Sequence, residues 1–223
     1  MAVMLDDGKP SRRLAAYHGA KAKGGAALTI VEAARVHPTG DSGRPAIRAY
    51  DPACVLGYKK LADACQSHGC LVFGQLTHPG REMVLASDGS RPVAYAPAAV
   101  PNERFHVMPR AMPITLINEI IKGFELSASH LSQAGLDGIE LVASHGYLLG
   151  QFLNPKINLR TDKYGGTFEG RLRFLRDAIQ ATRRGAGAEM IVGVRLSGED
   201  KDYTENEFSQ MREICSALDS ESD

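Results

Sequence analysis

Two side chains that can move a proton follow an apolar segment in the second half of the chain. His145 and Tyr147 come just after the apolar run at residues 139–142. In a (β/α) barrel, the groups beyond the C-terminal end of each strand project into one shared mouth, so this pair could face a common ligand. An imidazole and a phenol can each act as a general acid or base. The alternative is structural, because a polar residue near a strand end is often satisfied within the protein.

Two further polar side chains interrupt apolar segments elsewhere in the chain. Gln75 and Arg195 each lie near the end of such a segment, where an uncompensated polar group costs free energy unless something pairs with it. An amide can offer a donor and an acceptor to a planar cofactor, and a fixed arginine charge can stabilise negative charge on a reduced ring. The alternative is a structural polar layer at the mouth of such a barrel, in which Arg195 pairs with Glu32 or Glu140.

The composition is that of a single ordinary domain, and it favours small-molecule partners by elimination only. The 223 residues include 26 basic and 26 acidic side chains, so the charge balance does not favour nucleic acid. The 4 cysteines form no Cys-x-x-Cys pair, which argues against a metal site and a disulfide framework. No signal peptide and no apolar run of about 18 residues is present, so we expect a soluble, cytoplasmic protein without membrane contact.

The elements that must position these side chains alternate along the chain. Apolar runs predict strands at residues 26–32, 70–76, 138–142 and 190–196. Helical spacing predicts helices at residues 11–23 and after Asp51, Thr115, Thr167 and Thr204, the first three of these residues acting as N-caps. Residues 77–113 are rich in Pro, Gly and Arg and predict a long loop with a short hairpin at residues 93–95. A loop of this length is usually functional or covers a site.

This order predicts an α/β fold with a parallel sheet. Continuous apolar runs are typical of parallel strands that are covered on both faces. A doubly wound open sheet and part of a (β/α) barrel both fit the order, but no G-x-G-x-x-G turn follows a strand, which disfavours the first. A complete barrel has eight strands and typically about 250 residues, so the strands predicted here would form only part of one.

Three segments are distinctive as motifs: GCLVFGQLTHPGRE at 69–82, AGLDGIELVASHGYLLGQFLNPKINLRTDKYGGTFEGRLRF at 134–174, and VGVRLS at 192–197. They resemble the Old Yellow Enzyme family of FMN-dependent oxidoreductases, with a leaning towards its dienoyl-CoA reductase and trimethylamine dehydrogenase branch. Their order and spacing match over nearly the whole chain, including residues 13–40. The resemblance implies that residues 1–223 form a partial TIM (β/α)8 barrel, about strands two to five with their helices, lacking the first strand and strands six to eight.

The resemblance also implies roles for individual residues. Gln75 and Arg195 match positions that bind the pyrimidine edge of the flavin, and Ala33 matches a position where the backbone approaches it. Tyr147 matches the proton donor, and His145 matches a residue that hydrogen-bonds a substrate carbonyl. The implied activity is that of an FMN-dependent NAD(P)H oxidoreductase, in which NAD(P)H reduces FMN and an activated C=C of an enone or enoyl thioester is reduced in turn.

Some positions depart from the family pattern and leave alternatives open. Val142 stands where Old Yellow Enzyme proper has a polar residue, so carbonyl polarisation would rest on His145 alone. Gly170 stands where an Asn is common. The alternatives are a catalytically incompetent remnant and an FMN-dependent amine dehydrogenase, while a barrel lyase or aldolase is disfavoured because no strand ends in a lysine. Homo-oligomerisation would be one way to cover the open sheet edges of a partial barrel.

Overall fold

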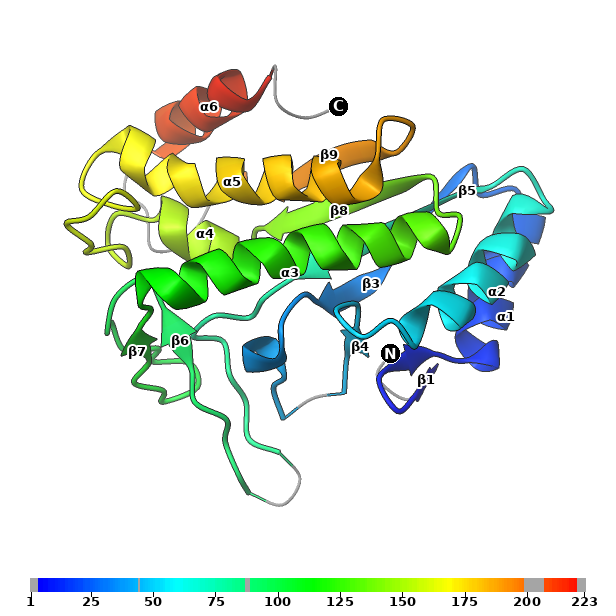
Figure 1. The fold of residues 1–223 in the computed structure, drawn as a ribbon, viewed down its shortest axis with the longest axis horizontal. Coiled ribbons are helices and arrows are strands. Elements are labelled where there is room, and N and C mark those ends of the chain that lie inside the picture. The colour runs from blue at the N-terminus through cyan, green and yellow to red at the C-terminus, as the bar shows by residue number, and fades with distance from the viewer. Residues whose placement is uncertain (1–3, 44, 87–88, 199–206, 220–223) are drawn as a thin grey trace.

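The computed structural model describes residues 4–43, 45–86, 89–198 and 207–219, with the backbone alone at 207–210 (Figure 1). The strands are β1 (Leu5–Asp6), β2 (Lys9–Pro10), β3 (Leu28–Arg35), β4 (Ile47–Arg48), β5 (Leu71–Thr77), β6 (Tyr95–Ala96), β7 (Arg110–Ala111), β8 (Gly138–Ala143) and β9 (Ile191–Leu196). The helices are α1 (Arg12–Lys23), the short 3-10 helix η2 (Pro38–Gly40), α2 (Cys54–Gln66), α3 (Ile114–Gln133), α4 (Leu148–Leu153), α5 (Phe168–Ala186) and α6 (Glu207–Leu218).

The main sheet has five parallel strands in the order β4-β3-β5-β8-β9. Each of β5, β8 and β9 pairs with the long strand that precedes it in the chain, and only the two-residue strand β4 lies on the other side of β3. The four long strands therefore follow one another in chain order, whereas a doubly wound sheet reverses the order of its long strands and carries helices on both faces. The prediction of a partial (β/α) barrel is therefore confirmed, and the doubly wound alternative is wrong.

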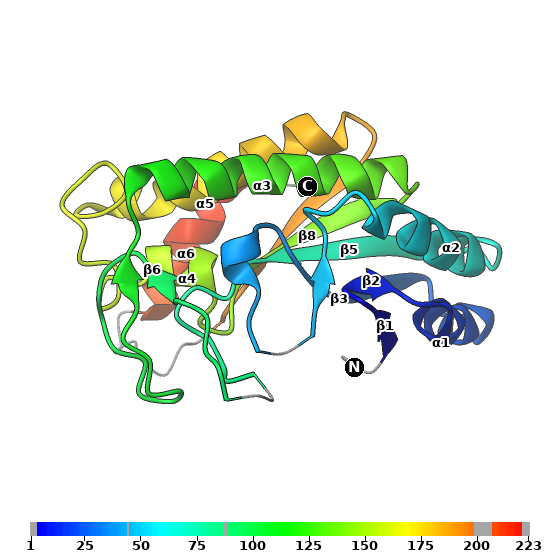
Figure 2. The same cartoon turned by 60° about the horizontal axis from the view of Figure 1, so that its bottom comes forward.

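The helices cover one face of this sheet. Figure 2 shows α3 and α5 lying along the same side of β5 and β8. Along this face α1 packs against α2, α2 contacts α3, and α3 packs against α5. The core between helices and sheet is formed by aliphatic and aromatic side chains with no exposed surface, among them Val31, Val72, Leu76, Ile139, Leu141, Ile117, Phe124 and Leu175.

The opposite face of the sheet is apolar towards the N-terminal ends of the strands, and no helix covers it in the described part of the chain. Its side chains include Leu28, Leu71 and Ile191, which are 44%, 44% and 41% exposed. Between them Phe73 lies over Gly138, where an added Cβ would come within 2.6 Å of the ring. The expectation that both faces are covered is therefore wrong for this chain alone. A closed barrel would bury these side chains as its interior layers.

One predicted helix cap is confirmed, and two are wrong. Thr167 caps α5, and its side chain accepts a hydrogen bond from the backbone N–H of Gly170. Helix α2 begins later than expected, at Cys54, and Asp51 instead accepts from the N–H of Ala53 in the preceding turn. Thr115 lies inside α3, which begins at Ile114 after Pro113. In the last case the rigid backbone of proline begins the helix without a side-chain cap.

Two other segments differ from the expectations. The predicted hairpin at residues 93–95 is wrong, because β6 pairs in parallel with β7, a segment farther along the chain. Strand β3 continues three residues beyond its predicted end, through a break in its pairing with β5 between Val31 and Ala34. The predicted start of the last helix at Thr204 lies outside the described residues.

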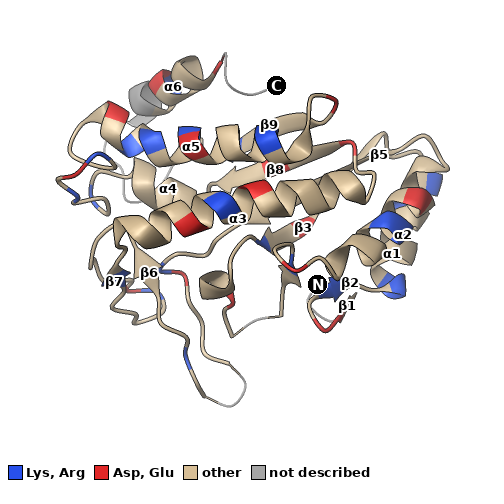
Figure 3. Ribbon diagram, viewed as in Figure 1, with Lys and Arg blue, Asp and Glu red and all other residues tan. Residues whose placement is uncertain are grey.

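Acidic and basic side chains both lie along α3 and α5 (Figure 3). One of their ion pairs joins Arg184 of α5 to Glu125 of α3 at 2.9 Å. All 4 cysteines are free thiols, and Cys54, Cys65 and Cys70 are buried. Among the described helices, none is both long enough and apolar enough to cross a membrane.

We expect Thr167→Ala to lower the free energy of unfolding by about 1 kcal/mol, because it removes the side-chain acceptor at the start of α5. Thr167→Ser keeps the hydroxyl and should leave stability nearly unchanged. Urea denaturation followed by circular dichroism measures both variants. Equal losses for the two substitutions would show that the hydroxyl is not what stabilises this helix end.

Candidate functional site

The predicted site residues lie together at one edge of the sheet. Because β3, β5, β8 and β9 are parallel, their C-terminal ends meet at this edge. Three of the five candidates lie in β3, β5 and β9, and the other two lie in the loop after β8; they are Ala33, Gln75, His145, Tyr147 and Arg195. The structure thus brings together residues that lie far apart in the sequence, as ligand-binding residues of a barrel do.

Gln75 and Arg195 are joined through Glu140. The Gln75 Nε2 atom donates a hydrogen bond of 2.5 Å to Glu140 Oε1, and Arg195 Nε donates to the same oxygen at 2.8 Å. Hydrogen bonding to Glu140 holds the pKa of Arg195 above its ordinary value. The Glu140 side chain is 13% exposed and that of Arg195 is 43% exposed. The mostly buried Glu140 carboxylate therefore holds the Gln75 and Arg195 side chains in place, while much of the Arg195 guanidinium remains accessible to solvent.

Ala33 lies in the irregular part of β3. Pairing with β5 breaks between Val31 and Ala34, so Glu32 and Ala33 lie opposite Gln75 without regular partners. Glu32 contacts His18 of α1 at 3.6 Å, whereas Arg195 pairs with Glu140, so of the two pairings expected for a polar layer the structure shows the one with Glu140. Regular pairing resumes at Ala34, which pairs with Leu76 and is buried in the core, so Ala33 directly before it points to the open face beside Gln75. A residue with no more than a methyl group there leaves room for a flat ligand.

His145 and Tyr147 are held by a tight turn at the end of β8. His145 and Gly146 both have positive φ values, 59° and 70°, and the N–H of Tyr147 donates to Ser144 O at 3.1 Å. His145 Nδ1 lies 2.7 Å from Ser144 Oγ, and the centroids of the His145 and Tyr147 rings are 6.2 Å apart. A left-handed conformation is strained for histidine, and such strain clusters at functional sites. The two predicted side chains are thus neighbours in space.

Gln151 joins the loops that follow β5 and β8, a role that the sequence did not reveal. Its buried side chain donates to Pro79 O at 3.1 Å and Gly146 O at 2.6 Å, and it accepts from the N–H of Arg81 at 3.2 Å. Gly80 leaves no space for a side chain here, because an added Cβ would lie 2.2 Å from Gln151 Oε1. The turn that carries His145 and Tyr147 is therefore fixed against the loop beside it.

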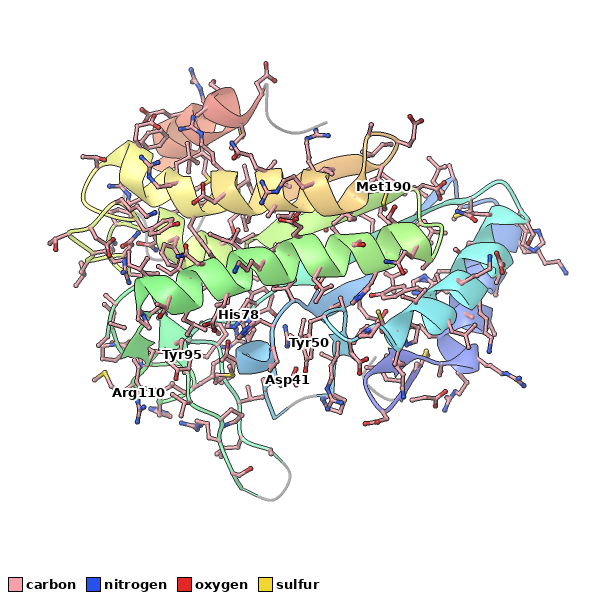
Figure 4. The ribbon with its side chains drawn as sticks, viewed as in Figure 1. Asp41, Tyr50, His78, Tyr95, Arg110 and Met190 are labelled. Atoms are coloured by element: carbon pink, nitrogen blue, oxygen red, sulfur yellow. The ribbon has the colours of Figure 1, made fainter. Side chains whose placement is uncertain are left out.

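His78 is a second residue that the sequence reasoning missed. It is buried, its Nδ1 accepts from the N–H of Gly80 at 3.0 Å, and its Nε2 lies 3.0 Å from Thr39 Oγ1. Thr39 Oγ1 in turn lies 2.8 Å from His37 Nδ1. The backbone carbonyl of His78 accepts from the N–H of Leu148, the first residue of α4. Figure 4 shows His78 beside η2, with Asp41 and Tyr50 nearby and Met190 at the far end of the strands.

The charge state of His78 links the fold to pH. Burial, reinforced by the nearby positive charge of Arg35, lowers the pKa of His78 to about 3. In the unfolded chain a histidine has a pKa of about 6.5, so between these values the unfolded state binds one more proton. Acid therefore favours unfolding in this interval, and the stability that neutral His78 contributes is fully present only above pH 6.5.

We expect the free energy of unfolding to fall by about 1.4 kcal/mol per pH unit between pH 6 and 4 through His78 alone. His78→Gln cannot take up this proton, so its unfolding free energy should depend less steeply on pH by that amount. Urea denaturation at several pH values measures the slope, and exposed His68→Gln is the matched control. Parallel slopes for wild type and His78→Gln would contradict the assignment.

Arg160 donates hydrogen bonds to the long segment between β5 and α3. Its Nη1 donates to Pro97 O at 2.9 Å and to Met112 O at 2.6 Å, and its side chain is 10% exposed. The same guanidinium holds Asp162 through two hydrogen bonds of 3.0 and 2.5 Å. These bonds from Arg160 hold the pKa of Asp162 below its ordinary value. One side chain thus ties β6 and β7 to the loop before α5.

Residues 1–221 match the model of the NADH:flavin oxidoreductase / NADH oxidase family. The chain is 36% identical to an NADH oxidase of Thermoanaerobacter brockii, over 96% of this chain and 33% of the relative. It is 35% identical to an NADPH dehydrogenase of Bacillus velezensis, over 89% of this chain and 56% of the relative. It is 36% identical to the multifunctional alkene reductase/demethylase OYE of Caballeronia cordobensis, over 82% of this chain and 27% of the relative.

A solved structure of a 2-naphthoyl-CoA reductase with 2-naphthoyl-CoA superposes on the fold with a TM-score of 0.86. It is 27% identical in sequence, and the match covers 97% of this chain and 34% of that one. The chain therefore spans between about a quarter and just over half of the length of the relatives it matches.

Proposed function

Because the chain belongs to the NADH:flavin oxidoreductase / NADH oxidase family, we propose that its open polar edge is the flavin and substrate side of a barrel oxidoreductase. The proposed reaction is the reduction of an activated C=C with NAD(P)H as the reductant and FMN as the cofactor. The observation that carries the proposal is the junction of Gln75, Glu140 and Arg195 beside the pair His145 and Tyr147.

The residues at this edge fit FMN. Gln75 and Arg195 present an amide and a guanidinium, which suit the donors and acceptors of the flavin pyrimidine edge, and Glu140 holds both in place. Ala33 leaves the open face free of a large side chain beside them. When bound, FMN would accept a hydride from NAD(P)H and deliver it to the substrate alkene. The positive charge of Arg195 would stabilise the negative charge of the reduced ring.

On the substrate side we assign separate roles to the two ring side chains. His145 would donate a hydrogen bond to the carbonyl oxygen that activates the C=C. Tyr147 would give its hydroxyl proton to the carbon next to that carbonyl, while the other alkene carbon receives the hydride. Hydride and proton together convert the C=C into a single bond, so the product is the saturated carbonyl compound. Val142 contributes no hydrogen bond on this side.

We assign β3, β5, β8 and β9 to barrel strands two to five. In that arrangement the exposed row Leu28, Leu71 and Ile191 would face the remaining strands of a barrel or a second copy of the chain. Covering this row would remove apolar surface from water, at about 25 cal/mol per Å² of area buried. The strands of this chain would then supply one wall of the flavin pocket.

The test is retention of FMN by the purified chain. We expect protein passed through a desalting column after mixing with FMN to keep flavin absorbance that bleaches with NADH or NADPH. Arg195→Met should weaken FMN binding about 10-fold to 100-fold, because it removes a charged hydrogen-bond donor. Arg184→Met on the outer surface of α5 is the matched control and should bind like wild type. Flavin that is lost equally from wild type and Arg195→Met would favour the alternative of an incompetent remnant.

A further inference from the structure

Strand β3 carries one extra residue where it passes the proposed flavin site. Between Val31 and Ala34 it advances by three residues, while its partner β5 advances by two, so Glu32 and Ala33 together lie opposite Gln75. An extra residue of this kind is a β-bulge, which re-aims side chains next to binding sites. Val31 and Ala34 have no exposed surface and both belong to the core. The bulge is therefore what lets Ala33 point to the open face directly before a core residue.

A regular strand would present Glu32 at the open face instead. Side chains alternate along a regular strand, so the residue after core residue Val31 would point to the open face and Ala33 would turn inwards. That face already holds the carboxylate of Glu140, which accepts from Gln75 at 2.5 Å. A second carboxylate there would repel Glu140 and the negative charge of a reduced flavin ring. The bulge thus keeps one negative charge out of the site.

His18 of α1 contacts the strand on both sides of Val31. The imidazole is 3% exposed, with Nδ1 2.7 Å from Thr29 Oγ1 and Nε2 3.6 Å from Glu32 Oε2. The other oxygen, Glu32 Oε1, is buried and has no hydrogen-bond partner within the described residues. Burial alone would raise the pKa of Glu32, but the neighbouring His18 outweighs this and lowers the pKa below its ordinary value. Glu32 is therefore a charged carboxylate that turns towards α1.

We infer that His18 is a positioning residue, which holds the bulge of β3 in place and so keeps the charge of Glu32 away from the flavin. The inference rests on the proposed function and adds a residue outside the open face to the same site. Thr29 fixes the orientation of the imidazole, and the far side of the ring faces Glu32. Without the imidazole the carboxylate loses the group that draws it to the helix side.

The binding of oxidised and of reduced FMN to the full chain tests this inference. Anaerobic isothermal titration calorimetry gives both affinities, and their ratio reports charge beside the ring. We expect His18→Leu to weaken the binding of reduced FMN about 10-fold more than that of oxidised FMN. His18→Gln keeps a hydrogen-bond donor, so its ratio should stay within about 2-fold of wild type. Adding Glu32→Gln to His18→Leu should restore the wild-type ratio, because the misplaced group is then neutral.

A buried histidine elsewhere provides the control. His130 of α3 is 5% exposed, and its Nδ1 lies 2.7 Å from Ala49 O. His130→Leu therefore removes a comparable imidazole from the core, and its FMN affinity ratio should equal that of wild type. If His18→Leu weakened both redox states alike, and Glu32→Gln restored nothing, His18 would have a structural role only and the inference would be overturned.

Hydrogen exchange of the flavin-free chain provides a second measurement. Peptides covering residues 28–35 should exchange about 5-fold faster or more in His18→Leu, and at the wild-type rate in His130→Leu. Thr29→Val removes only the hydroxyl beside the imidazole, so it should give a smaller change in the same direction even where His18→Leu fails to fold. A wild-type chain that does not retain FMN contradicts the proposed function alone. Unchanged exchange in both His18→Leu and Thr29→Val would overturn the role of His18.

Discussion

Arg160→Met should lower the free energy of unfolding by about 2–4 kcal/mol, because it leaves two buried backbone carbonyl groups without a donor, while Asp162 is 36% exposed and its loss of a partner adds little. The substitution leaves Asp162 without its two hydrogen bonds and leaves the carbonyl oxygens of Pro97 and Met112 without a donor. Because methionine has a similar length, the loss reflects these polar groups more than a cavity. Chemical denaturation followed by circular dichroism gives the difference.

Arg184→Met provides the control for Arg160→Met. Arg184 also binds a carboxylate, that of Glu125, but its side chain is 56% exposed, so the expected loss is below about 1 kcal/mol. Arg160→Lys should recover little stability, because an ammonium group cannot reach Pro97, Met112 and Asp162 in the fixed geometry of a guanidinium. A loss from Arg160→Met as small as that from Arg184→Met would show that the segment between β5 and α3 is held by other contacts.

The strands and long helices were predictable because their patterns are local. Each of β5, β8 and β9 was predicted to within a residue at either end, since an apolar run bounded by glycine or polar residues marks a buried strand. The end of β3 was missed, because the irregular pairing around Ala33 breaks the alternation on which such a reading depends. The caps predicted at Asp51 and Thr115 are wrong because Pro52 and Pro113 change where the backbone enters each helix.

Some residues of the candidate site could likewise be predicted from local sequence, and others could not. Gln75, Arg195, His145 and Tyr147 could be chosen from the sequence, because each is a polar side chain within an apolar run or directly after one. The contact between His18 and Glu32 was not predicted, because the bulge that turns Glu32 towards α1 leaves no pattern in the sequence. The role of Gln151 depends on contacts with a loop that lies 70 or more residues away in the sequence, and that of His78 on a contact 39 residues away. No local pattern encodes such contacts.

Tyr147→Phe should slow alkene reduction by the FMN-loaded chain about 100-fold to 10,000-fold, the range expected for loss of a positioned general acid. The substitution removes only the hydroxyl oxygen, and the turn at Ser144 that holds this residue uses backbone atoms. Reduction of the flavin by NAD(P)H needs no proton from Tyr147, so that rate should change by less than about 2-fold. Stopped-flow absorbance at the flavin band measures the two half-reactions separately.

The split between the half-reactions is what identifies Tyr147 as a proton donor, because a merely structural role would disturb both. Tyr17→Phe on α1 removes the same atom from a half-buried tyrosine outside the proposed site, and it should leave both rates unchanged. If Tyr147→Phe reduced the alkene at the wild-type rate, the proton would have to come from another group, and His145 would be the first to examine because its ring lies 6.2 Å away. If both half-reactions slowed together, Tyr147 would instead be holding the flavin, and its position as the N-cap of α4 would be the feature that matters.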